Sequence, residues 1–95
     1  MKHNMLSQKR ADAAQTKFLR LGDIAGWVGA VLLLGAYLAV STGTLTSDSF
    51  WYQILNIAGA IGMFILASAR RAMPSAITNI IWAIIGIVAI IGIIF

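Results

Sequence analysis

The stretch FWYQILNIAGAIGMFILASA, residues Phe50–Ala69, contains no charged side chain. An α-helix of this length extends roughly 30 Å, which matches the hydrocarbon thickness of a bilayer. Two further charge-free runs flank it, IAGWVGAVLLLGAYLAVS at Ile24–Ser41 and the run from Ser75 to Phe95. The sequence therefore predicts an all-α integral membrane protein, a bundle of three transmembrane helices at about 24–41, 50–69 and 75–95.

The composition of the 95-residue chain fits one small membrane domain, because 60% of its residues are hydrophobic and only 11% are charged. Cysteine is absent, which excludes disulfides, thiolate metal sites and cysteine nucleophiles. The single histidine, His3, and the three acidic residues lie far apart and have no spacing suited to acid–base or metal chemistry. We therefore expect no enzyme activity, no metal and no cofactor.

The basic residues predict how the helices are oriented. Five of the seven precede the first run, two follow the second, and the loop between those runs has none. Because positive charge is enriched on the cytoplasmic side of membrane proteins, we expect the N-terminus inside and the C-terminus outside, in a bacterial inner membrane. This grouping is a topology signal and does not indicate nucleic-acid binding. The residues that carry the signal are Lys9, Arg10, Lys17, Arg20, Arg70 and Arg71.

Residues 1–23 form a basic cytoplasmic segment ahead of the transmembrane domain at 24–95. A disordered tail that only sets topology is one interpretation. The other is an interfacial helix bound to anionic headgroups, with its basic residues on or beside the face opposite its apolar one. A cleaved signal peptide is disfavoured, since the first run exceeds the usual apolar core. The apolar face of the interfacial helix consists of Ala11, Ala14, Phe18 and Leu21.

Small residues recur at spacings of three or four along all three runs. In lipid, where no hydrophobic force drives helices together, such residues let helix backbones approach closely. We therefore predict that one face of each helix packs against a neighbour. The positions predicted for this role include Gly26, Gly59, Met63 and Gly86.

Polar side chains within the runs are few, and an amide in hydrocarbon needs a hydrogen-bond partner. Gln53 and Asn56 are three residues apart and share one helix face. Asn79 and Trp82 are expected to bond to a neighbouring helix of this chain or of a partner. The alternative is that these groups face a small solute. Pro74 suits the first turn of the third helix.

Four segments of the sequence, GWVGAVLLLGAY, STGTL, YQILN and MPSAITNIIW, resemble a family of short, uncharacterised bacterial three-span membrane proteins over residues 22 to about 88. The layout is more distantly similar to bacterial half-sized SWEET (MtN3-like) sugar transporters, three-helix units that work as parallel homodimers. That resemblance implies a substrate-facing role for Asn79, five residues after Pro74. Two other features of those transporters are absent from this sequence. Ala39 and Val40 stand in place of their Pro-Gln pair, and Met63 stands in place of their substrate-contacting Trp.

Two functions follow as expectations from these observations. The first is a non-enzymatic accessory or assembly subunit, which packs its helices against other chains of a larger bacterial membrane complex. The alternative is a SWEET-like half-transporter, in which a second copy of the chain completes a path for a small solute. In both cases the bilayer is the solvent. A surface enzyme subunit has no support in the sequence beyond the basic segment.

Overall fold

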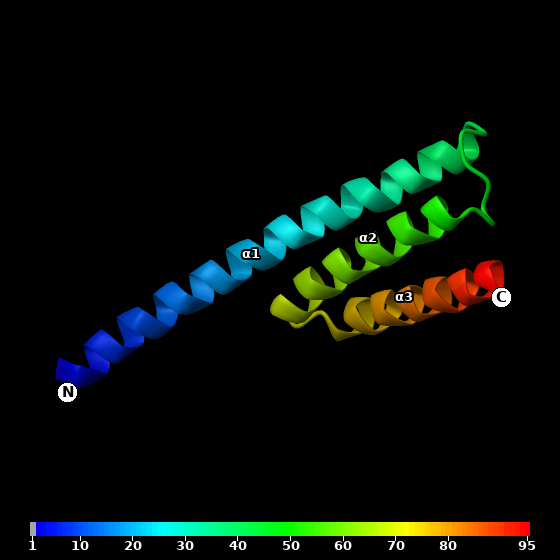
Figure 1. Cartoon of the computed structure of the whole chain (residues 1–95). Coiled ribbons are helices and arrows are strands. Elements are labelled where there is room, and N and C mark those ends of the chain that lie inside the picture. The colour runs from blue at the N-terminus through cyan, green and yellow to red at the C-terminus, as the bar shows by residue number, and fades with distance from the viewer. Residues whose placement is uncertain (1) are drawn as a thin grey trace.

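The computed structural model describes residues 2–95, with side chains described from residue 4 onward. Three α-helices follow one another in this range (Figure 1): α1 at Lys2–Ser41, α2 at Phe50–Ala69 and α3 at Met73–Ile94. Each is long and apolar enough to cross a membrane. Together they indicate a multi-pass membrane protein whose helices run side by side.

Helix α2 is the central element of the bundle. It packs along α1 on one side and along α3 on the other, whereas no Cα atom of α1 lies within 8 Å of one in α3 among the described residues. The outer helices are therefore held together only through α2. This order leaves a lateral groove between α1 and α3.

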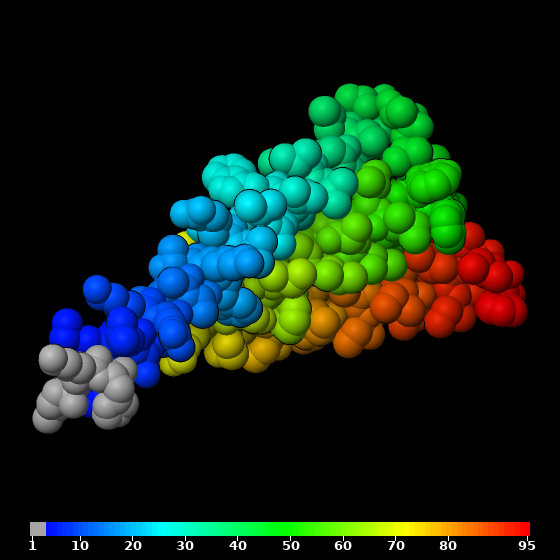
Figure 2. Space-filling model, turned by 60° about the vertical axis from the view of Figure 1, so that its left-hand side comes forward, coloured from blue at the N-terminus to red at the C-terminus, as the bar shows by residue number. Residues whose placement is uncertain are grey.

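Helix α1 continues without a break through the boundary predicted at residue 23, and its 40 residues account for the 61 Å length of the molecule. The sequence of residues 1–23 contains no proline, and its single glycine, Gly22, is buried against α2. An interfacial helix would require a bend at this point. Instead, residues Asn4–Leu21, hereafter the arm, extend straight beyond the other two helices, and Figure 2 shows the N-terminal end projecting from the bundle.

The ends of α2 and α3 are defined by short polar signals. Ser49 caps α2, its hydroxyl accepting the Tyr52 backbone N–H at 3.1 Å. After α2, Arg71 adopts a left-handed conformation with φ of 58°, which reverses the chain within three residues. Helix α3 begins at Met73, two residues before the predicted start, and Pro74 occupies its first turn, where its missing N–H costs little.

The interior of the bundle is built from small side chains. The buried hydrophobic residues are all alanines, and no large side chain is fully buried among the described residues. Large aliphatic and aromatic groups point outward instead, as expected for a chain whose solvent is lipid. The close packing of the helices therefore depends on backbone proximity. The buried alanines are Ala36, Ala60, Ala67, Ala76 and Ala83.

Candidate functional site

The contact between α1 and α2 is made by glycine backbones. A Cβ atom added to Gly29 would lie 2.6 Å from the carbonyl oxygen of Gly59, and one added to Gly59 would lie 2.9 Å from the carbonyl oxygen of Gly29. A Cβ on Gly62 would lie 3.0 Å from the Cα of Gly29. Any larger residue at these positions would push the two helices apart.

The other predicted packing residues also lie inside this chain. A Cβ on Gly86 would lie 2.6 Å from Cγ1 of Ile57, so this part of α3 rests on α2. Gly26 lies against the Leu66 side chain, and the backbone of Met63 lies beside Gly29. The buried glycines therefore build the bundle itself and present little surface to another protein, as does the backbone of Met63.

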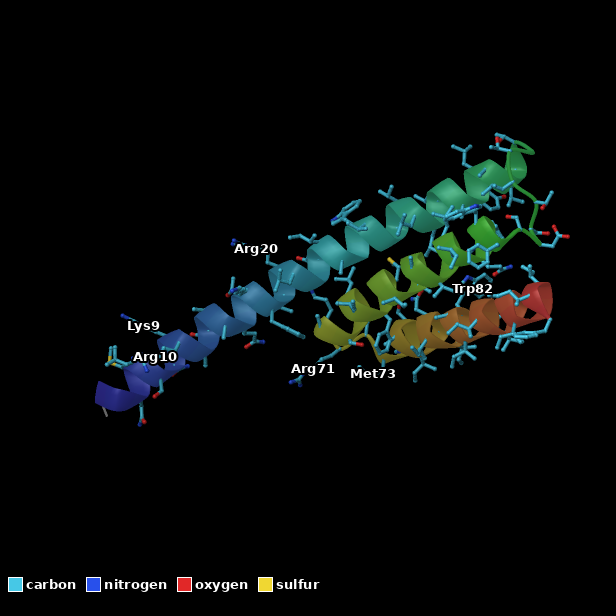
Figure 3. The ribbon with its side chains drawn as sticks, in the orientation of Figure 1. Lys9, Arg10, Arg20, Arg71, Met73 and Trp82 are labelled. Carbon is cyan, nitrogen blue, oxygen red and sulfur yellow. The ribbon has the colours of Figure 1, made fainter. Side chains whose placement is uncertain are left out.

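Trp82 links α3 to α2 through its indole. Its Nε1–H donates to Oδ1 of Asn56 at 3.4 Å, and Asn56 in turn donates through Nδ2 to the Tyr52 carbonyl at 2.8 Å. Asn56 is the buried polar residue of the bundle, only 8% exposed. Figure 3 shows Trp82 between α2 and α3.

Asn79 is predicted from the sequence to bond to a neighbouring helix of this chain or of a partner, and within this chain its amide bonds only inside its own helix, among the described residues. Its Nδ2 donates to the Ser75 carbonyl at 2.9 Å, one turn back within α3. Thr78 likewise donates to the Pro74 carbonyl at 2.8 Å. Short polar side chains in a helix often donate in this way to a backbone carbonyl of the preceding turn. In the part of the chain that the structure describes, Oδ1 of Asn79 has no hydrogen-bond partner.

The groove between α1 and α3 holds a cavity of about 310 Å³ that is open to the side of the bundle. Its lining includes Asn56 from α2 and Asn79 and Trp82 from α3, so polar groups of two helices meet in this cavity. Sequence reasoning missed Leu33, Tyr37, Tyr52 and Thr78, which complete the lining. They could not be grouped from sequence, because their proximity depends on which helix lies between the others.

Gln53 does not line this cavity. It borders a smaller one of about 120 Å³ between α2 and α3, together with Asn56, Trp82 and Gly86. Its Nε2 donates to the Ser47 carbonyl at 3.1 Å, which ties the start of α2 to the preceding loop. Gln53 and Asn56 thus border one space, as their spacing predicts, while Gln53 bonds to the loop.

An ion pair joins α1 to α2 at the basic end of the bundle. Arg70 donates to Asp23 through Nη2, 2.7 Å from Oδ2, and through Nε, 3.2 Å from Oδ1. Both side chains are about half exposed, at 50% and 42%. Arg71, by contrast, points away from the bundle in Figure 3. The pair fixes the relative position of the helix ends at the base of the arm.

Among the side chains of residues 4–95, no three histidine or carboxylate groups come close enough to hold a metal ion. The candidate site is an amphipathic groove. Its polar atoms are amides, hydroxyls and an indole, and its walls are aliphatic and aromatic.

Comparison with known proteins places the chain in a family. A family model, that of an uncharacterised family, matches residues 22–95, and the chain belongs to that family. The match covers all three apolar runs and begins at Gly22, where the arm ends. It shows no similarity to the SWEET transporters. No curated protein and no solved structure matches the chain.

Proposed function

We propose that the chain is a non-enzymatic accessory or assembly subunit of a larger bacterial membrane complex. A transmembrane helix of another chain packs into the groove between α1 and α3. The observation that carries the proposal is the set of amide, hydroxyl and indole groups in the lining of this groove, which is open to the side.

The free carbonyl oxygen of Asn79 favours a partner, because hydrocarbon cannot form hydrogen bonds. Asn79 uses its donor within α3 and leaves its carbonyl oxygen Oδ1 available in the groove. An unsatisfied polar group in lipid costs free energy, whereas a hydrogen bond between helices in a membrane contributes about 0.6–2 kcal/mol. A neighbouring helix with a donor at this depth therefore gains stability from the contact.

The arrangement of the helices also suits a fourth helix. Packed helices have axes roughly 8–10 Å apart, and α1 and α3 both touch α2 while remaining apart from each other. A helix that contacts α1 and α3 together completes a four-helix bundle, in which facing side chains fill the centre. The cavity then becomes the interior of the assembly.

The proposed orientation has the N-terminus in the cytoplasm and the C-terminus outside, in the bacterial inner membrane. The Asp23–Arg70 pair brings the base of the arm and the end of α2 to the same end of the molecule. All seven basic residues therefore lie toward one end, and the loop at residues 42–49 lies at the other. This segregation supports a cytoplasmic basic end.

Native mass spectrometry of the protein extracted from its own membrane in mild detergent tests the proposal. We expect a mass that contains other polypeptides. Thr78→Trp fills the groove from an exposed position and should release them, whereas Ile77→Trp, one residue away and 55% exposed, should not. A mass of one or two copies of this chain alone contradicts the proposal.

A homodimeric half-transporter of a small solute is the second candidate. The same polar lining favours it, since Asn79, Thr78 and Tyr52 offer hydrogen bonds to a solute between two copies. If this function holds, Asn79→Ala abolishes uptake into proteoliposomes while the protein remains folded. Uptake equal to that of empty liposomes for every class of solute would eliminate it.

A further inference from the structure

The arm extends beyond α2 and α3 as a single helix. Its 18 residues correspond to roughly 27 Å of α-helix. Every side chain in it is exposed except that of the half-buried Leu19. The exposed groups include large apolar ones, with Phe18 at 58% and Leu21 at 56%. Such residues on the part of the chain proposed to lie in water mark an interaction surface.

The base of the arm packs against the end of α2 and continues in line with the rest of α1. A Cβ on Gly22 would lie 2.9 Å from Cβ of Ala69, so α1 and α2 are in close contact at this level. One residue further on, Asp23 is paired with Arg70. For the arm to lie on the bilayer surface, the continuous helix α1 would have to break next to Gly22. A protein partner therefore suits it better than the lipid surface.

The apolar side of the arm continues the side of α1 that faces α2. Ala11, Phe18 and Ala25 are seven residues apart, a spacing that returns to nearly the same side of a helix. The backbone carbonyl of Ala25 faces Gly62 of α2, where an added Cβ would lie 2.5 Å from it. Beyond the end of α2 the same side has no neighbour among the described residues. A further helix can pack against this side of the arm in the way that α2 packs against the rest of α1.

Cations lie beside this apolar side and opposite it. At 3.6 residues per turn, Arg10 and Lys17 lie about a quarter turn from Phe18, while Lys9 and Arg20 lie on the far side of the helix. Figure 3 shows Lys9 and Arg20 pointing away from α2. An occupant of the apolar side therefore meets Arg10 and Lys17 at its edge, as charged positions flank a coiled-coil seam.

We propose that the arm docks an acidic amphipathic helix of a partner protein on the cytoplasmic side. The apolar residues of that helix cover Ala11, Ala14, Phe18 and Leu21, and its carboxylates face Arg10 and Lys17. The inference rests on the proposed function, since it names the chemistry of a partner in the same complex. The apolar contact supplies affinity and the charges fix the register.

A photoreactive benzoylphenylalanine in place of Phe18 tests the contact in the native membrane. We expect a cross-link to one protein, and mass spectrometry should map it to an acidic segment with apolar residues at helical spacing. The matched control carries the same group in place of Thr16, on the far side of the arm. It should give no cross-link. Cross-links only to lipid, only to another copy of this chain, or equally from both positions would overturn the proposal.

Charge reversal gives a second, independent test of the same contact. With the photoreactive group at position 18, Arg10→Glu combined with Lys17→Glu should abolish the cross-link. Lys9→Glu combined with Arg20→Glu changes the net charge equally but lies opposite the docked helix, and it should leave the cross-link intact. Equal loss in both pairs would show a general charge effect and overturn the proposal.

Native mass spectrometry separates failure of this inference from failure of the proposed function. A complex that retains its other polypeptides but gives no cross-link from position 18 overturns the docking at the arm alone. A chain found without other polypeptides overturns the proposed function as well.

Discussion

At the scale of single residues, the bundle is joined by a few polar atoms in an apolar setting. The indole of Trp82 and the amide of Asn56 form the side-chain hydrogen bond between α3 and α2. Its length of 3.4 Å is longer than that of most N–H···O hydrogen bonds, so the bond is weak. Asn79, three residues before Trp82, bonds within its own helix and leaves its carbonyl oxygen without a hydrogen-bond partner among the described residues. Two neighbouring polar residues thus serve different contacts.

Trp82→Phe should destabilise the bundle slightly, because it removes the indole N–H but keeps an aromatic ring. We expect a loss of about 0.6 kcal/mol in the free energy of unfolding, typical of a hydrogen bond between membrane helices. Denaturation in mixed detergent micelles would measure it. Trp27→Phe is the control, because Trp27 is 74% exposed. An equal loss in both variants would mean that the bond contributes nothing.

At the scale of helices, the central contact is a backbone contact between α1 and α2. Gly29 meets Gly59 and Gly62 so closely that carbonyl oxygens occupy the space of a side chain. The sequence predicted packing by small residues because they recur at helical spacing on every run. Which helix each stripe meets could not be predicted, since the spacing is the same in all three.

Gly29→Ala should force α1 and α2 apart, because its Cβ would lie 2.6 Å from a backbone oxygen that has no rotamer with which to move away. We expect a loss of about 1–3 kcal/mol in unfolding free energy, as for other overpacked interiors. Gly35→Ala is the matched control on the same helix, where nothing lies within 4 Å of the added Cβ. Equal stability of the two variants in detergent denaturation would contradict the observed contact.

At the scale of the whole molecule, the decisive feature is the order of the helices. With α2 in the centre, the groove between α1 and α3 opens to the side. The arm begins where α1 and α2 are joined by the Asp23–Arg70 ion pair. Both proposed contact surfaces depend on this order. A bundle in which α1 touched α3 would close the groove.

Cysteine pairs would test the order of the helices directly, because the chain has no cysteine of its own. A disulfide requires Cα atoms about 4.4–6.8 Å apart. We expect Gly22→Cys with Ala69→Cys to cross-link on mild oxidation, since these positions are in contact. Gly22→Cys with Ser75→Cys should not cross-link, because no Cα atom of α1 lies within 8 Å of a Cα atom of α3 among the described residues. Gel mobility under non-reducing conditions reports both, and the reverse pattern would refute the fold.

The sequence by itself determined the solvent of this protein and the number and approximate length of its helices. Hydropathy and charge act locally along the chain, so charge-free runs at 50–69 and ending at Ser41 correspond closely to α2 and to the end of α1. Local rules also permitted either a tail or a helix before residue 23.

Only the tertiary structure decided that α1 is continuous, that α2 lies between its neighbours, and that Leu33, Tyr37 and Thr78 share a groove with Asn79. The physical reason is that helix pairing in lipid depends on how surfaces fit in three dimensions. The three stripes of small residues are too alike in sequence to specify that fit.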